Sequence, residues 1–261
     1  MLFNSNDIAV WEATLAQYPD ALQHHVANKK DDSLLVLDEW YQNTLPQMLA
    51  DRTPMYIDSK ELCQLMSWKL KRGKFRPSLA KLAASNADAD VKRTSQDAFQ
   101  LVPSSLKGAI TKMAELKGVA ILCAGAPSEV PFMADETMDS VPGLGTIAYT
   151  IPYYLKFATK VIEKAVELKD KGSITVHSPH LVEMALWTDY MLSKYNVPRV
   201  SPGSKATEKA AGKATAETTK ISEKKRAAET SEGEAKEKKS PKKAKAATAT
   251  PPSTRSLRKR A

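Results

Sequence analysis

The chain has 261 residues, enough for one large domain or two small ones. Residues 201–261 hold 17 of the 39 Lys and Arg but only 7 of the 30 Asp and Glu, so this segment carries a net charge of +10 and residues 1–200 carry −1. All aromatic residues lie at or before Tyr195. These distributions exclude a uniformly basic DNA-binding domain. They also exclude a C-terminal segment that folds alone, because Ile221 and Leu257 are its only apolar residues larger than alanine.

We therefore divide the chain into a globular domain, residues 1–198, and a disordered Lys/Ala-rich basic tail, residues 199–261. The two cysteines cannot form a disulfide framework, and the first residues lack the features of a secretory leader. No apolar run approaches the roughly 18 residues of a membrane span. We expect an intracellular protein with no membrane association.

Apolar residues recur at helical spacing through the globular domain, which predicts an all-α, multi-helix body. Helices are expected near residues 7–28, 33–50, 77–85, 91–102 and 105–116. Pro19 and Pro46 are expected to interrupt or kink the first two. The run at 145–151 is β-prone, but a single strand has no partner, so we interpret it as a connection.

Three further helices have sequence signals at their ends. One begins after Asp58, where Glu three residues on suggests a capping box, and stops at Gly73. A second begins at Thr150 with Pro in its first turn and ends near Gly172. A third begins at Ser178 with the same cap-then-Pro pattern.

Two basic clusters in the tail are separated by nine residues. This spacing is typical of a bipartite nuclear localisation signal, since import receptors offer two acidic grooves. The clusters are Lys224, Lys225 and Arg226, then Lys236, Lys238, Lys239, Lys242, Lys243 and Lys245. We predict that the protein is nuclear and that an import receptor binds it. The alternative is that the basic tail only increases solubility and carries no localisation signal.

The sequence Ser240-Pro241-Lys242-Lys243 resembles an element of linker-histone tails. Lys242 and Lys243 would contact phosphates of DNA or another polyanion. Phosphorylation of Ser240 would add roughly −1.5 to −2 charges beside them and weaken that contact.

The densest basic cluster of the body lies between Trp68 and Pro77. Its cations are Lys69, Lys71, Arg72, Lys74 and Arg76. Trp68 and Phe75 are interleaved with them, and bases with aromatics can hold a nucleic-acid backbone and stack on an exposed base. The alternative is that Trp68, Leu70 and Phe75 are core residues and the charges form a solvated helix end.

Residues 105–136 contain a helix, then Leu116-Lys117-Gly118-Val119, a short apolar segment, and Asp135 after Val130 and Pro131. This order resembles the helix-hairpin-helix DNA glycosylase superfamily. The hairpin is degenerate, because the second glycine is missing and the second helix is shorter than the family's by a turn or two. The Trp68–Pro77 stretch, followed by a helix and then this segment, also resembles uncharacterised all-helical eukaryotic proteins.

The resemblance implies that the backbone around Lys117 and Gly118 holds a DNA phosphate and that Asp135 supports chemistry on a flipped-out base. No lysine lies between Gly118 and Asp135, so an enzyme of this type would be monofunctional. The alternative is an ordinary helical hairpin in which Asp135 caps a helix.

Other catalytic patterns are missing: the sequence has no P-loop, no complete dinucleotide fingerprint and no metal-ligand spacing, so we expect no cofactor and no metal. Three hypotheses remain. The first, which we favour, is a non-enzymatic nuclear binding protein whose tail supplies import and nonspecific nucleic-acid tethering. The second is a DNA-repair glycosylase acting through Asp135, and the third is a scaffold that binds only a protein partner.

Overall fold

The structure is a computed structural model, which describes residues 1–102, 104–119 and 129–201. These residues belong to one compact unit, Met1–Ser204, and form helices and loops with no strand among them. The elements in chain order are a 3-10 turn (Leu2–Asn4), α1 (Ile8–Ala16), α2 (Tyr18–Lys29), α3 (Ser33–Glu39), a π-helical turn (Trp40–Thr44), α4 (Leu45–Ala50), α5 (Ser59–Arg72), α6 (Pro77–Ala84), α7 (Asp88–Leu101), α8 (Leu106–Met113), α9 (Asp135–Ser140), α10 (Ile151–Asp170) and α11 (Pro179–Lys194). The all-α prediction for the body is confirmed. The predicted tail lies outside the described residues.

The three helices with end signals begin as predicted. At α5, Oδ1 of Asp58 accepts from the Glu61 N–H at 2.8 Å, and the Glu61 carboxylate accepts from the Asp58 N–H at 2.9 Å. Thr150 and Ser178 cap α10 and α11 with a single bond each, because their hydroxyls accept from the N–H groups of Tyr153 and Leu181. Each cap satisfies an N–H that has no partner within its helix.

The prolines act where the sequence predicts. Pro19 lies in the first turn of α2, after a break at Gln17. Pro46 lies in the first turn of α4, and the π-helical turn Trp40–Thr44 separates α4 from α3. Residues 145–150 form a connection without strand structure, as expected. The short helix α9 was not among the predicted helices; the alternative in which Asp135 caps a helix places a start there, but Ala134 is the N-cap residue and Asp135 is the first residue of the helix.

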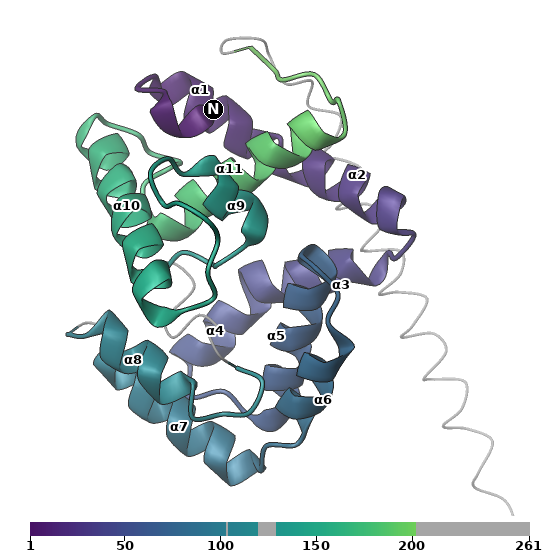
Figure 1. Cartoon of the computed structure of the whole chain (residues 1–261), viewed down its shortest axis with the longest axis vertical. Coiled ribbons are helices and arrows are strands. Elements are labelled where there is room, and N and C mark those ends of the chain that lie inside the picture. The colour runs from purple at the N-terminus through teal and green to yellow at the C-terminus, as the bar shows by residue number, and fades with distance from the viewer. Residues whose placement is uncertain (103, 120–128, 202–261) are drawn as a thin grey trace, which may run out of the picture. The chain divides into compact units, whose positions relative to one another are not determined.

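Two groups of helices build the core. In one, α11 packs against α1, α2, α9 and α10, and in the other α5 packs against α3, α6 and α7. Figure 1 shows α10 and α11 beside α1 and α2, with α7 and α8 paired at the opposite edge. One face of helix α5 lies in the core, and its C-terminal end leads into the loop that carries Lys74, Phe75 and Arg76.

Candidate nucleic-acid interface

The loop after α5 presents an aromatic side chain to solvent. Phe75 is 72% exposed and stands between Lys74, which is also exposed, and Arg76. Trp68 and Leu70, by contrast, are buried at 1% and 4% exposure. The core alternative is therefore correct for Trp68 and Leu70 and wrong for Phe75.

Arg72 faces the interior of the body. Its Nη1 and Nη2 donate to the two carboxylate oxygens of Glu183 on α11 at 2.9 and 3.1 Å, and both side chains are 1% exposed. The ring of Trp187 lies 4.5 Å from the guanidinium carbon. Burial lowers the pKa of Arg72, but the carboxylate of Glu183 outweighs it and the pKa is raised. Arg72 is thus a charged core residue, turned away from any surface that nucleic acid reaches.

Lys29, from α2, contacts the C-terminal end of α5. Nζ of Lys29 donates to the carbonyl oxygens of Lys71 and Gly73, each at 2.6 Å. Lys71 itself forms an ion pair with Asp31. Cations stabilise the exposed carbonyls at a helix C-terminus. Lys29 therefore extends the basic surface, while Asp31 offsets the charge of Lys71.

A cavity of about 170 Å³ opens beside this loop and brings distant residues together. The predicted residues among its lining are Lys69, Lys74, Arg76, Gly118 and Asp135. They come from α5 and its loop, from the hairpin and from the start of α9. Five residues that sequence reasoning assigned to nucleic-acid contact or catalysis therefore share one site.

Asp135 is the first residue of α9, one position after the N-cap residue Ala134. Nζ of Lys74 lies 2.9 Å from its carboxylate, and the Tyr149 hydroxyl approaches both carboxylate oxygens, at 2.8 and 2.9 Å. Burial raises the pKa of Asp135, but hydrogen bonds from Lys74 and Tyr149 outweigh it, so the pKa is lowered. Asp135 is a carboxylate near neutral pH.

Tyr149 organises the rim of this cavity. Nη2 of Arg76 donates to its hydroxyl at 3.0 Å, and the guanidinium of Arg76 stacks on its ring at 4.6 Å from the centroid. The sequence did not single out Tyr149, which lies in the β-prone connection 73 residues after Arg76. No pattern in the sequence of this connection indicates a role for Tyr149, whose side chain is 49% exposed in the structure.

The hairpin glycine has a packing role. Gly118 has φ +78°, and a Cβ there would lie 2.9 Å from the carbonyl oxygen of Leu79 on α6. The backbone of Lys117 is bound by Asn86, whose Oδ1 accepts from the Lys117 N–H at 2.9 Å. The N–H of Lys117 is therefore engaged within the protein, while its side chain is exposed.

Several predicted residues lie outside the described part of the chain. They are the second helix of the hairpin and the tail residues Lys224, Lys225, Arg226, Lys238, Lys239, Ser240, Lys242, Lys243 and Lys245. Within the described residues, no group of three acidic, His or Cys side chains is arranged to hold a metal ion. None of the described helices is long and apolar enough to cross a membrane.

No protein-family model, curated protein or solved structure matches the chain. The resemblance to the glycosylase superfamily therefore rests on residues 105–136 alone.

Proposed function

We propose that the chain is a non-enzymatic nuclear protein that binds nucleic acid, with the tail providing import and electrostatic tethering and the body contacting unpaired bases. The observation that carries this proposal is the exposure of Phe75 between two cations. An exposed aromatic ring costs hydration free energy in a free monomer and gains stacking energy on a base.

The charge distribution supports separate roles for the tail, which attracts phosphates, and the body, which contacts bases. The body carries a net −1, so most of the attraction to phosphates comes from the +10 of the last 61 residues. The loop adds local cations, Lys74 and Arg76, beside the ring. A sequence-tolerant preference for single strands follows from stacking, because every base offers a π face.

The test is fluorescence anisotropy of the full chain with a labelled single strand of about 20 nucleotides and with the matching duplex. Phe75→Ala should weaken single-strand binding by roughly 5- to 150-fold, which corresponds to the stacking energy of one base. Duplex binding should change little. The dependence of affinity on salt should stay the same, since no charge is removed.

The control is Ile174→Ala, which removes another exposed apolar side chain, 83% accessible. Ile174 follows the C-terminal end of α10, and Tyr149 precedes its N-terminal end, about 30 Å away along this 20-residue helix. The control should bind like the parent chain. Equal affinity of Phe75→Ala and the parent for single strands would remove the body from the binding mechanism.

Import is tested separately, by imaging a fluorescent fusion of the full chain in cells. Replacing Lys224, Lys225 and Arg226 with alanine should abolish nuclear accumulation, since a bipartite signal needs both clusters. Replacing Arg255, Arg258 and Arg260 removes the same charge outside the two clusters and should leave accumulation intact. Equal loss in both variants would favour a tail that only increases solubility.

One observation favours the glycosylase alternative: an ionised Asp135 lines the same cavity as Gly118. The volume of about 170 Å³ opposes it, because pockets that enclose a ligand span roughly 300–1,000 Å³. We therefore expect no base excision by the parent chain. Base excision by the parent chain that disappears in Asp135→Asn would establish the glycosylase instead. If the chain binds neither single strands nor duplexes, the remaining hypothesis is a scaffold that binds only a protein partner.

A further inference from the structure

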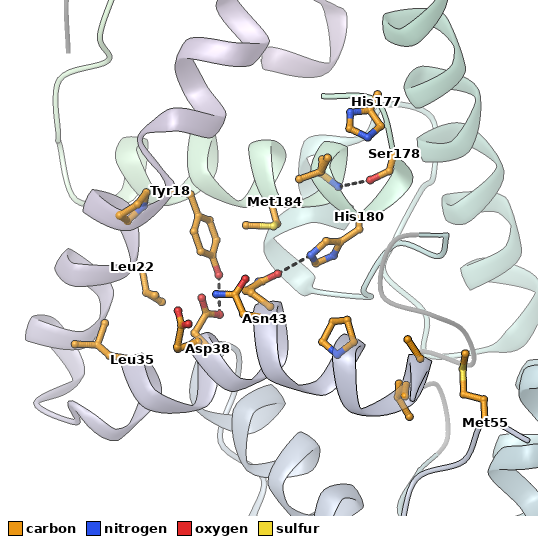
Figure 2. Close-up of a pocket in the computed structure, with 17 residues that line it drawn as sticks. Tyr18, Leu22, Leu35, Asp38, Asn43, Met55, His177, Ser178, His180 and Met184 are labelled. Carbon is orange, nitrogen blue, oxygen red and sulfur yellow. Dashed lines mark hydrogen bonds between the residues drawn. The ribbon is translucent and has the colours of Figure 1, made fainter. Parts of the chain in front are cut away.

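A second and larger cavity, of about 780 Å³, lies between α2, α3, the π-helical turn, α4 and the start of α11. Its volume falls within the roughly 300–1,000 Å³ typical of small-molecule sites. Leucine, proline and methionine side chains supply most of its wall. Figure 2 shows the polar side chains Tyr18, Asp38, Asn43 and His180 gathered at its centre, within this apolar surround.

Asp38 is a buried carboxylate in the wall of this cavity. It is 4% exposed, and its Oδ1 accepts from the Tyr18 hydroxyl and from Nε1 of Trp68, both at 2.8 Å. Among the described residues, Oδ2 has no hydrogen-bond donor and Asp38 has no ion-pair partner within 4.0 Å. A buried charge without a counter-ion is costly.

The core cation Arg72 does not meet this need. Arg72 influences Asp38 electrostatically, but its Nη1 and Nη2 donate to Glu183, and among the described residues it makes no hydrogen bond to Asp38. Arg72 interacts with both Glu183 and Asp38, and the buried Glu136 adds a further carboxylate that acts on Glu183. Asp38 is the only one of these four side chains that lines the cavity.

The other residues that line the cavity also make it acidic. Glu39 is exposed at the cavity and adds a second carboxylate, and none of the described residues that line the wall is Lys or Arg. Burial lowers the pKa of His180 to about 4, so its ring is neutral near pH 7 and adds no positive charge. The cavity is thus acidic as well as apolar.

The backbone beside Asp38 is unusual. The π-helical turn Trp40–Thr44 places Gln42 and Asn43 in the wall of the cavity. Nε2 of His180 contacts Oε1 of Gln42 at 2.7 Å, which leaves Nε2 of Gln42 and Nδ1 of His180 buried without partners. Single π turns within helices are rare and frequently mark functional sites. Buried polar atoms without hydrogen-bond partners in the wall also indicate a functional site.

We infer that this cavity binds a small apolar molecule carrying one protonated amine, with the ammonium at Asp38 and the apolar body against the leucine and proline wall. The ammonium supplies the missing counter-charge and donates to Oδ2.

Three probes of similar shape test the charge requirement: 4-phenylbutylamine, 4-phenylbutanol and 4-phenylbutyrate. Binding to the full chain is measured by isothermal titration calorimetry near neutral pH. The amine should bind roughly tenfold or more tightly than the alcohol, as a charge-assisted hydrogen bond requires, and the carboxylate should bind weakest. Equal affinity for all three, or no measurable binding of any, would overturn the inference.

Two variants test whether the ammonium of the ligand binds at Asp38. Asp38→Asn keeps an oxygen for Tyr18 and Trp68 but removes the charge, so the amine and the alcohol should bind alike. Asn43→Lys is at an exposed position and does not endanger folding. Its own ammonium should enter the cavity, abolish amine binding and raise the melting temperature.

A matched control comes from the mouth of the cavity. Glu39→Gln removes an exposed carboxylate, so it should weaken amine binding only slightly, and less so at high salt. If the preference for the amine persists in Asp38→Asn, or if Asn43→Lys binds it like the parent, Asp38 is not the anchor. Phe75→Ala should leave amine binding unchanged, which keeps this test independent of nucleic-acid binding.

Discussion

The assignment of Arg72 to the core rather than to a nucleic-acid surface makes a strong prediction about stability. Arg72→Met retains the length and apolar stem of the side chain but removes the charge. Glu183, 1% exposed, then remains in the core without the two hydrogen bonds at 2.9 and 3.1 Å. Breaking a buried ion pair in this way costs about 3–5 kcal/mol.

This free energy translates into a large shift in melting temperature. Each kcal/mol lowers Tm by roughly 2–4 °C in a domain of this size, so Arg72→Met should melt roughly 6–20 °C below the parent. The double variant Arg72→Met/Glu183→Leu should recover most of the loss, since a well-packed apolar pair replaces a buried ion pair at little cost.

The assays are thermal denaturation, which gives Tm, and urea denaturation, which gives the free energy of unfolding. Both follow the full chain by far-UV circular dichroism, with Lys74→Met as the matched control. Lys74 is exposed and its ion pair with Asp135 lies at the surface, so its loss should cost less than about 1 kcal/mol. The reasoning is refuted if Arg72→Met is no less stable than Lys74→Met, or if the double variant is no better than the single. A loss of nucleic-acid affinity in Arg72→Met under conditions where it is folded would also contradict the core assignment.

Three further predictions concern local features. Burial lowers the pKa of His180 to about 4, so the unfolded chain takes up this proton first. The stability that His180 contributes is fully present above about pH 6.5 and is lost as the pH drops toward 4, by up to about 3 kcal/mol. Burial also lowers the pKa of His25 to about 4, so His180→Gln should reduce the fall in Tm across that window without removing it. Gly118→Ala should cost at least about 2 kcal/mol, because the new Cβ meets the carbonyl of Leu79, whereas Gly145→Ala, with the same sign of φ and open space around it, should cost about 1 kcal/mol by urea denaturation. Asp58→Ala should lose about 1 kcal/mol in the same assay, and Asp58→Asn much less, because asparagine also caps a helix.

The helices were predictable where their ends are encoded locally. A capping residue, the residue three positions later and a proline in the first turn act within a few residues, so Asp58, Thr150 and Ser178 could be recognised in sequence. Helix α9 has only six residues and too few turns for an apolar stripe to appear. Its residues are held by packing against α11, which the sequence does not reveal.

The candidate site was predictable as a set of residues but not as an arrangement. The cluster at 69–76 is visible as charge, yet the sequence alone does not sort Arg72 from Lys71, because the partner Glu183 is 111 residues away. One usable signal was present: Leu65, Trp68 and Arg72 are spaced by three and four, so Arg72 continues the buried stripe of α5. We assigned Arg72 to nucleic-acid contact because of its charge, without using this signal, whereas the structure buries it.

Asp38 is a second residue whose charge suggests the surface but whose side chain is buried. It ends an apolar run, Leu34 to Leu37, and nothing in that run indicates that its carboxylate accepts from Tyr18 and Trp68. Those donors come from α2 and α5, so the site exists only after the helices have packed.

Helix α5 therefore serves both candidate sites: Trp68 holds Asp38 at the cavity, Arg72 neutralises Glu183, and the loop beyond carries Phe75. A variant that weakens α5 should impair amine binding and nucleic-acid binding together, whatever the ligands are. Only changes outside its helical span, Asn43→Lys for the cavity and Phe75→Ala for the loop, separate the two functions. If each of these variants lost only its own ligand, the two sites would be independent surfaces of one scaffold; joint loss from either would show that they are coupled through α5.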